Sequence, residues 1–279
     1  MPYASGLKAV SLFIRARACS TVMMIVKLGG SVITRKDRYR SFRRAVTRRL
    51  AQEIADSGEQ VVLVHGAGSF GHLVASRHNL DKGYSGTEQM PALSRVMQDV
   101  RDLNLRVMDA LENALLPVVS LPPAACASMK GGKLERLDTE LFRKYMEMGA
   151  LPVTFGDVVL DREMGFSICS GDQLIRRLAE EFRPKRVVFC ADVDGIYSAD
   201  PKKDREAELL TTVDRSYLRT LSKRTSYVDV TGGMYGKLEN MLAISSTGAE
   251  VMVINGFAEG RLSQALRGKK VIASKVVGG

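Results

Sequence analysis

The stretch that decides the fold is Val61-Val62-Leu63-Val64-His65-Gly66-Ala67-Gly68-Ser69-Phe70-Gly71-His72. Its four leading apolar residues, three of them β-branched, predict a buried strand. A glycine-rich turn follows at once, and an amphipathic stretch follows the turn. A strand that runs through glycines into a helix presents backbone N–H groups at a positive helix end, which favours an anion and most often a phosphate. His72 stands where its side chain can donate to the same anion.

The spacing Gly66-x-Gly68-x-x-Gly71 also fits the fingerprint of dinucleotide-binding proteins. Such a unit needs a second strand that ends in an acidic residue roughly 20 positions further on. Residues 79–88 occupy that place, and they are polar, contain glycine and do not have the pattern of a strand. The sequence therefore argues against a nicotinamide or flavin site and leaves a phosphate loop, or a tight turn without a ligand.

The composition describes a globular chain with a substantial core. Its 279 residues are 45% hydrophobic, enough for one large domain or two small ones. No run approaches the ~20 apolar residues that cross a bilayer, so no membrane partner is expected. The cysteines are scattered without a CxxC pair, which favours neither a zinc site nor a disulfide framework and suits the cytoplasm. They are Cys19, Cys126, Cys169 and Cys190.

The formal net charge of +10 suits polyanionic ligands. Its densest part is the run that contains Arg43, Arg44, Arg48 and Arg49, where apolar residues recur beside the arginines at helical spacing. We interpret this run as the solvated face of an amphipathic helix. Aromatic residues make up only 6% of the chain and tryptophan is absent, so stacking platforms for bases are scarce and no nucleic-acid partner is expected.

Residues 1–22 differ from the rest, because they are basic, free of acidic residues and only weakly apolar. Their apolar core, Leu12-Phe13-Ile14, is too short for a signal peptide. We expect a disordered tail or a misplaced start here, and a single domain over residues 23–279.

Strand-like and helix-like segments alternate along that domain, which predicts an α/β fold with an open, mostly parallel sheet sandwiched between helices. Ligands bind beyond the carboxyl ends of such strands, so the glycine turns should gather at one edge. Residues 197–227 are polar and are expected to form a flap on the nucleotide side. The expected strands are 24–28, 61–64, 117–121, 151–155, 186–191, 251–254 and 271–273, with a hairpin of 158–160 and 166–169. The expected helices are 41–56, 69–78, 87–116 (capped by Thr87), 172–182 and 236–247.

Three further clusters surround this pattern. Lys27-Leu28-Gly29-Gly30-Ser31, with Lys36 close behind, suits a polyphosphate tail. Ser170-Gly171-Asp172-Gln173 opens a helix, where Asp172 is either an N-cap or a site carboxylate. Asp229-Val230-Thr231-Gly232-Gly233-Met234-Tyr235-Gly236-Lys237 is a glycine turn that enters a helix with a lysine in its first turn. It is not a Walker A loop, because Leu238 stands where that motif has serine or threonine.

Together these segments resemble the amino acid kinase superfamily over roughly residues 23–277. The distinctive pieces are Lys27-x-Gly29-Gly30-Ser31, His65-Gly66-Ala67-Gly68, Asp192-Val193-Asp194-Gly195-Ile196-Tyr197-x-x-Asp200-Pro201 and Thr231-Gly232-Gly233-Met234-x-x-Lys237. Within the superfamily, Gly68-Ser69-Phe70-Gly71-His72 together with the segment from Lys27 to Lys36 looks most like the isopentenyl phosphate kinases.

This resemblance implies ATP-dependent phosphorylation of isopentenyl phosphate to isopentenyl diphosphate, with Mg²⁺, by a homodimer. Asp172 would orient Lys27 and Lys237, and His72 would hold the acceptor phosphate. The implied catalytic residues are Lys27, Lys36, His72, Asp172 and Lys237. The implied ATP-binding residues are Lys27, Gly29, Gly30, Asp192, Asp194, Gly195, Tyr197, Gly232, Gly233 and Lys237. The implied substrate-binding residues are Gly66, Ala67, Gly68, Gly71, His72 and Gly171, and no residue is implied as a metal ligand.

The residue inventory suits this chemistry. A phosphate acceptor is already an anion, so it needs no general base, only groups that hold it in line and cations that stabilise the transferred group. His65 is expected to be structural and His78 to face solvent, and an apolar slot for the acceptor is expected near Phe70, Tyr84, Met90 and Leu93. Two alternatives stay open: a related kinase acting on another phosphate or a phosphonate such as fosfomycin, and a basic, non-catalytic module that binds nucleotides or nucleic acid.

Overall fold

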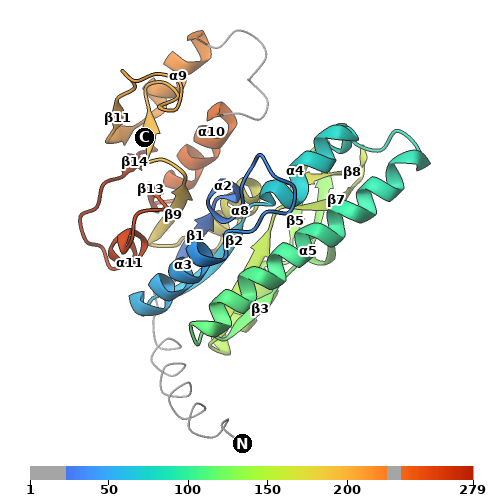
Figure 1. Ribbon diagram of the computed structural model, residues 1–279, viewed down its shortest axis with the longest axis horizontal. Helices are drawn as coiled ribbons and strands as arrows, with labels where there is room; N and C mark the ends of the chain where they lie inside the picture. The colour runs from blue at the N-terminus through green and yellow to red at the C-terminus, as the bar shows by residue number, and fades with distance from the viewer. Residues whose placement is uncertain (1–22, 225–233, 279) are drawn as a thin grey trace, which may run out of the picture.

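An eight-stranded sheet forms the centre of the computed structural model, which describes residues 23–224 and 234–278 (Figure 1). The strand order is β12-β14-β13-β9-β1-β2-β6-β3. The predicted tail, residues 1–22, lies outside the described residues. The strands are β1 (Met23–Leu28), β2 (Gln60–His65), β3 (Val118–Ser120), β6 (Leu151–Phe155), β9 (Arg186–Ala191), β12 (Thr212–Val213), β13 (Glu250–Asn255) and β14 (Ser274–Val276).

The sheet is mostly parallel, as the sequence predicted. Strand β1 pairs in parallel with both β2 and β9, and these pair in parallel with β6 and β13. Strand β14 runs antiparallel to β13. The register sets Leu28 opposite both His65 and Cys190, and His65 opposite Phe155, so the carboxyl ends of the central strands lie level. The loops that follow these strands therefore emerge at one edge of the sheet.

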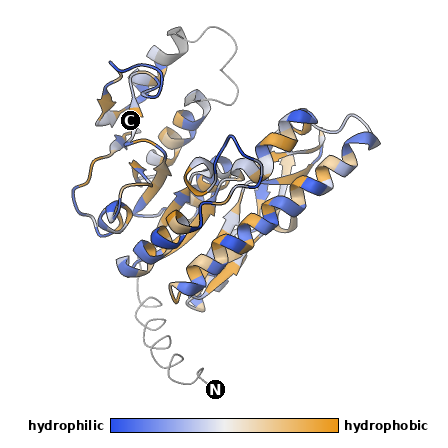
Figure 2. Ribbon diagram, in the orientation of Figure 1, coloured by the Kyte–Doolittle hydropathy of each residue, from blue (hydrophilic) through white to orange (hydrophobic). Residues whose placement is uncertain are grey.

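Helices cover both faces of this sheet. Alternate residues of a strand point to opposite faces, and here both faces are buried: Ile25 belongs to an apolar cluster with residues of α7, α8 and α10, whereas Val26 belongs to one with residues of α2, α3, α5 and α11. The strands are accordingly hydrophobic, while the outer faces of α3 and α5 are hydrophilic (Figure 2). The helices are α2 (Gly30–Ile33), α3 (Arg44–Ser57), α5 (Met90–Asn113), α7 (Thr139–Glu147), α8 (Gly171–Phe182), α10 (Met234–Ser245) and α11 (Arg261–Leu266).

A second sheet of four strands, in the order β5-β4-β7-β8, lies beside the carboxyl edge of β6. The predicted hairpin is confirmed, since β7 (Asp157–Asp161) pairs antiparallel with β8 (Gly165–Cys169). The sequence analysis missed the other hairpin, β4 (Ala127–Lys130) with β5 (Lys133–Leu137). The Asp161 carboxylate joins the two hairpins, because it accepts the N–H groups of Gly131 and Gly132 at 2.9 and 2.8 Å and the Ser167 hydroxyl at 2.8 Å.

Several predicted boundaries were wrong. Thr87 does not cap the long helix: η2 (Thr87–Gln89) is a separate 3₁₀ turn, and α5 begins after it with Pro91 in its first turn. The last strand is β14 and not residues 271–273, which precede it. Part of the expected flap is integrated into the fold, because β12 joins the main sheet. The remaining elements are α4 (Gly68–Arg77), η1 (Leu80–Lys82), α6 (Pro123–Cys126), β10 (Ile196–Tyr197), β11 (Leu209–Leu210) and α9 (Arg215–Arg224).

Candidate active site

The two glycine turns that follow β1 and β2 touch each other. A Cβ atom on Gly30 would lie 2.7 Å from both Cα and N of Gly68, and one on Gly66 would lie 2.8 Å from N of Gly30. Gly68 also has a positive φ of 49°, which L side chains rarely adopt. Glycine is therefore required here for close packing of backbone on backbone, and this packing sets the starts of α2 and α4 side by side.

The resemblance implied that Gly29 binds ATP and that Gly66 binds the acceptor, but the N–H group of neither residue is available to a phosphate. The N–H of Gly29 donates to the Cys190 carbonyl at 3.0 Å, and the N–H of Gly66 donates to the Leu28 carbonyl at 3.0 Å. Both groups extend the ladder of the parallel sheet by one residue. The N–H groups of Gly30 and Gly68 open α2 and α4 instead, and a helix leaves such first-turn groups without an intrahelical acceptor. These are the donors that remain for an anion.

Lys27 and Asp172 form an ion pair at this edge. Lys27 Nζ lies 2.6 Å from Asp172 Oδ1, and both side chains are largely buried. Ser170 is the N-cap of α8, because its Oγ accepts the N–H of Gln173, so the N-cap interpretation of Asp172 was wrong. A Cβ on Gly171 would lie 3.6 Å from Lys27 Cε, so the lysine side chain passes directly over this glycine. Among the described residues Asp172 makes no ion pair with Lys237.

The other predicted cations gather around His72, which is exposed in the first turns of α4. Desolvation and the positive charges of Lys237, Lys36 and Lys27 lower the pKa of the His72 imidazole. These lysines come from α10, from the loop after α2 and from β1. The fold therefore brings together Lys27, Lys36, His72, Asp172 and Lys237, the five residues that the sequence analysis named as catalytic.

The other two histidines lie as the sequence predicted. His65 is buried, its Nε2 lies 3.2 Å from Asn104 Oδ1, and its ring stacks on Phe155 at 5.2 Å between centroids. Burial lowers the pKa of His65 to about 4, so its imidazole is neutral and structural. His78 is exposed and is the C-cap residue of α4.

Two carboxylates, Asp192 and Asp194, follow β9 in the segment where the resemblance placed the nucleotide. Asp192 accepts the Ser31 hydroxyl at 3.0 Å and pairs with Lys202. Desolvation raises its pKa, but the hydrogen bond from Lys202 and the charge of Lys36 outweigh this effect and the net pKa is lowered. Asp194 pairs with Arg261 and accepts a hydrogen bond from Asn255 at 3.2 Å.

The sequence analysis missed these partners of Asp192 and Asp194. The sequence did contain a signal for Asn255: it precedes Gly256 at the end of a buried strand, as His65 precedes Gly66. Gly195 is buried, with Ser274 N 2.9 Å from the place of a Cβ, so its role here is close packing. The Tyr197 carbonyl accepts the Tyr217 hydroxyl at 3.0 Å. Gly232 and Gly233 lie outside the described residues.

The described residues form no cage for a metal. Over residues 23–224 and 234–278, no group of three or more His, Cys, Asp or Glu side chains is arranged to hold an ion. In the same part of the chain, none of the helices combines the length and the apolar character of a membrane span.

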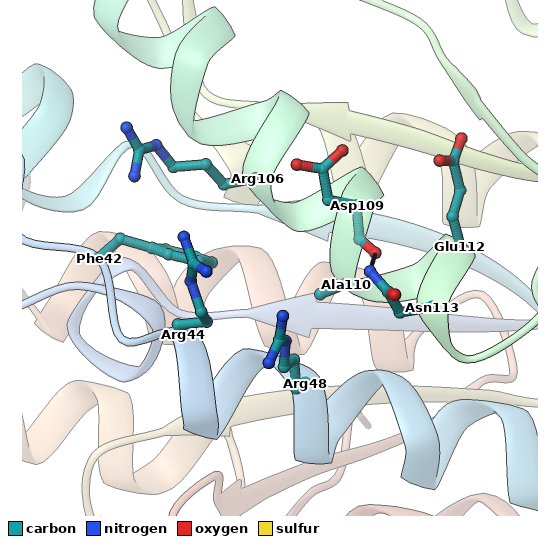
Figure 3. A pocket seen from close by; sticks show the side chains of 8 residues that line it. All are labelled: Phe42, Arg44, Arg48, Arg106, Asp109, Ala110, Glu112 and Asn113. Carbon is teal, nitrogen blue, oxygen red and sulfur yellow. Dashed lines mark hydrogen bonds between the residues drawn. The ribbon is translucent and has the colours of Figure 1, made fainter.

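A pocket of about 180 Å³ lies elsewhere, between α3 and α5 (Figure 3). Arg44 and Arg48 line it from α3, and Asp109 and Glu112 line it from α5, so its charges are mixed. It contains none of the five catalytic candidates. Its lining residues are Phe42, Arg44, Arg48, Arg106, Asp109, Ala110, Glu112 and Asn113.

Two expectations about neighbouring residues were wrong in part. Arg44 and Arg48 are exposed as predicted, but Arg43 lies over the Phe257 ring at 5.2 Å and Arg49 pairs with the buried Glu53, so these two arginines hold the fold together. Phe70 cannot line a slot for the acceptor, because its side chain is fully buried. Tyr84 and Met90 are about half exposed, and Leu93 is partly buried.

Comparison with known proteins agrees with this geometry. The model of the amino acid kinase family matches residues 23–255, and the chain belongs to that family. Within it, the chain groups with the isopentenyl phosphate kinases. It is 38% identical over 264 residues to the isopentenyl phosphate kinase of Methanothermobacter thermautotrophicus, which covers 92% of this chain and 99% of the relative. It is 37% identical to that of Thermoplasma acidophilum, over 84% of this chain and 92% of the relative.

Solved structures give the same result. An X-ray structure of isopentenyl phosphate kinase superposes with a TM-score of 0.80 at 36% identity, covering 91% of this chain and all of the other. A substrate complex of isopentenyl phosphate kinase superposes with a TM-score of 0.78 at 32% identity, over 91% and 99% of the two chains. The fosfomycin alternative and the non-catalytic alternative find no support among these relatives.

Proposed function

We propose that this chain transfers the γ-phosphoryl group of ATP to isopentenyl phosphate, giving isopentenyl diphosphate and ADP. The observation that carries the proposal is the assembly of His72, three lysines and the Lys27–Asp172 ion pair at the carboxyl edge of the parallel sheet. Two isopentenyl phosphate kinases that are 37–38% identical to this chain, and that match it over 92–99% of their own length, support the choice of acceptor.

The acceptor phosphate lies against His72 and the start of α4 in this proposal. A neutral imidazole donates one N–H, and the first-turn N–H of Gly68 points out of the positive end of the helix. The acceptor oxygen is already anionic, so the protein has only to hold it in line with the γ-phosphorus of ATP. Because nothing has to be deprotonated, the step needs no general base.

The lysines stabilise the charge that spreads over the transferred group. In a loose transition state this charge lies on the three equatorial oxygens, and cations fixed in advance lower the barrier most. Lys27 is fixed by Asp172 at 2.6 Å, whereas Lys36 and Lys237 approach from the loop after α2 and from α10. Asp172 is thus a positioning residue for Lys27, because the ion pair holds the lysine ammonium group in place between turnovers.

Mg²⁺ belongs to the substrate in this scheme, as MgATP. The ion keeps oxygen ligands from phosphates and water, so it needs few protein ligands. The carboxylates nearest the proposed phosphates are poor candidates for Mg²⁺ ligands, because Asp172 and Asp192 are already paired with Lys27 and Lys202.

We further propose that residues 23–279 act as one domain and that the nucleoside lies near Asp192, Asp194 and the segment 231–233. We also propose that the protein works as a homodimer in the cytoplasm.

An acceptor panel tests the proposal. Purified protein with ATP and Mg²⁺ is offered isopentenyl phosphate, fosfomycin, UMP, glutamate and acetylglutamate, and kcat/KM is measured for each. Isopentenyl phosphate should lead the panel by at least tenfold. Lys27→Ala and Lys237→Ala should lower kcat by orders of magnitude. If isopentenyl phosphate is left unconverted while another acceptor is phosphorylated, the assignment of the acceptor is wrong.

A further inference from the structure

The loop of residues 35–41 carries Lys36 and leads from α2 into α3 (Figure 1). Its base is closed by an antiparallel bridge between Thr34 and Phe42 and by the hydrogen bond from Arg35 N to the Ser41 carbonyl at 2.9 Å. Lys36 directly follows Arg35 and is exposed. At the returning end, Arg40 has a φ of 51°, in the left-handed region that side chains other than glycine seldom adopt. Something must therefore hold this conformation.

Arg40 is held by two carboxylates of α5 and by the start of α4. Its guanidinium lies 3.4 Å from Asp99 Oδ1 and pairs with Asp102. Its backbone N–H donates to the Ser69 carbonyl at 3.3 Å, and its guanidinium lies over the buried Phe70 ring at 5.7 Å. Strained backbone persists where the surrounding structure fixes it from several sides, and such positions concentrate near functional sites.

Asp99 is the central member of this arrangement. It is only 1% exposed, and it accepts the Tyr39 hydroxyl and the Arg95 Nε–H while facing Arg40. Tyr39 and Arg40 are consecutive residues, so one buried carboxylate fixes two adjacent positions of the loop. A buried carboxylate is costly unless it is paired in this way. The phosphoryl transfer proposed above makes no use of Asp99 itself.

The other end of the loop reaches the site. The loop brings Lys36 near His72 and Asp192, since the charge of Lys36 contributes to the lowered pKa of both groups. We propose that Asp99 is a positioning residue that holds residues 35–41 through Tyr39 and Arg40, so that Lys36 meets the phosphoryl group in transfer. This inference rests on the proposed function and adds a residue on α5 that touches neither substrate.

Removing the charge of Asp99 should act on the turnover rate and not on acceptor binding. Asp99→Asn keeps the volume but weakens the attachments of Tyr39 and Arg40 to Asp99, so the loop should leave the left-handed conformation at Arg40 more readily, although Asp102 still pairs with Arg40. A displacement of about 1 Å in a positioned group costs on the order of 100-fold in rate, so we expect kcat to fall by about 10- to 100-fold. The KM for isopentenyl phosphate should change by less than about threefold, because His72 stays in place.

A double-mutant cycle with Lys36→Met separates positioning from general damage. If Asp99 acts through Lys36, Asp99→Asn should lower kcat by less than about twofold when Lys36 is already methionine. Glu250→Gln is the matched control: it removes a carboxylate that pairs with Arg186, at the opposite edge of the sheet, and should leave kcat unchanged. Tyr39→Phe removes a single donor to Asp99 and serves if Asp99→Asn does not fold; its smaller loss of kcat should likewise vanish without Lys36.

The proposal is overturned if Asp99→Asn keeps kcat within twofold of the unmodified protein, or if it lowers kcat as strongly in the Lys36→Met background. Amide hydrogen exchange provides a readout that does not depend on the acceptor. Exchange in residues 35–41 should be faster in Asp99→Asn and unchanged in Glu250→Gln. Equal rates in the two variants and the unmodified protein would refute the proposal that Asp99 holds this loop. If the unmodified protein fails to phosphorylate isopentenyl phosphate, the proposed function fails, and the exchange rates still decide whether Asp99 holds the loop.

Discussion

Replacing Gly30 by alanine tests whether the two glycine turns must touch for the phosphates to line up. The added Cβ would lie 2.7 Å from Cα and N of Gly68, whereas carbon atoms in contact sit about 3.5 Å apart. The neighbours are backbone atoms at the start of α4, so no side chain can rotate away. The two turns must therefore separate by about 0.8 Å, the difference between these distances.

This separation moves the start of α4, with His72, away from the turn that follows Lys27. Because a displacement of about 1 Å costs on the order of 100-fold in rate, Gly30→Ala should lower kcat by roughly 10- to 100-fold. The assay is the steady-state rate of ADP formation with isopentenyl phosphate, alongside a thermal unfolding curve for each variant. A folded Gly30→Ala protein with kcat within twofold of the unmodified protein would refute the reasoning.

Gly58 offers a matched control for the same substitution. It ends α3 with a positive φ of 72°, but nothing lies within 4 Å of the place of its Cβ. Gly58→Ala should therefore lower the free energy of unfolding by about 1 kcal/mol through backbone strain and leave kcat unchanged. The pair of variants separates lost stability from lost alignment.

Three further predictions concern the ionisable groups. Asp172→Asn should lower kcat by at least tenfold, since Lys27 loses the carboxylate 2.6 Å away, while the KM for isopentenyl phosphate changes little in steady-state assays. The pKa of His72 is lowered in the free protein, and an acceptor dianion should raise it; calorimetry in two buffers should therefore show that His72→Asn takes up fewer protons on binding isopentenyl phosphate than the unmodified protein does at the same pH. Burial lowers the pKa of His65 to about 4 from 6.5, so the unfolded chain binds more protons between these values, and stability should fall as pH drops through this window. Urea unfolding should show the loss from pH 7.5 to 5 to be about 2 kcal/mol larger than in His65→Gln.

The sequence predicted the sheet well because its strands are buried on both faces. Mainly apolar runs located β6 and β9 to the residue, since polar residues or glycine stand close to both ends of each run. The glycine turns and lysines followed, because a parallel sheet sends all its strand ends to one edge. The β4–β5 hairpin was missed although Gly131-Gly132 marks its turn, because its outer strand is largely exposed and alternates charged with apolar residues only weakly.

The finer distribution of roles depended on contacts between distant segments, which no local pattern reports. A free N–H and one bonded across the sheet look alike in sequence, so Gly29 and Gly66 were predicted as phosphate donors and are not. The sequence gives no sign that Asp99 differs from the other polar residues of the long helix. Only the packing of the loop 35–41 on α5 reveals that it is buried and that Tyr39 and Arg40 converge on it.

The most direct test of the central claim is a crystal structure of the complex with isopentenyl phosphate and a non-hydrolysable ATP analogue. We expect the acceptor phosphate against His72 and the start of α4, in line with the terminal phosphate of the analogue, with Lys27 and Lys36 within hydrogen-bond distance of the two groups. An acceptor phosphate bound elsewhere, such as among Arg44 and Arg48 in the pocket between α3 and α5, would contradict the account.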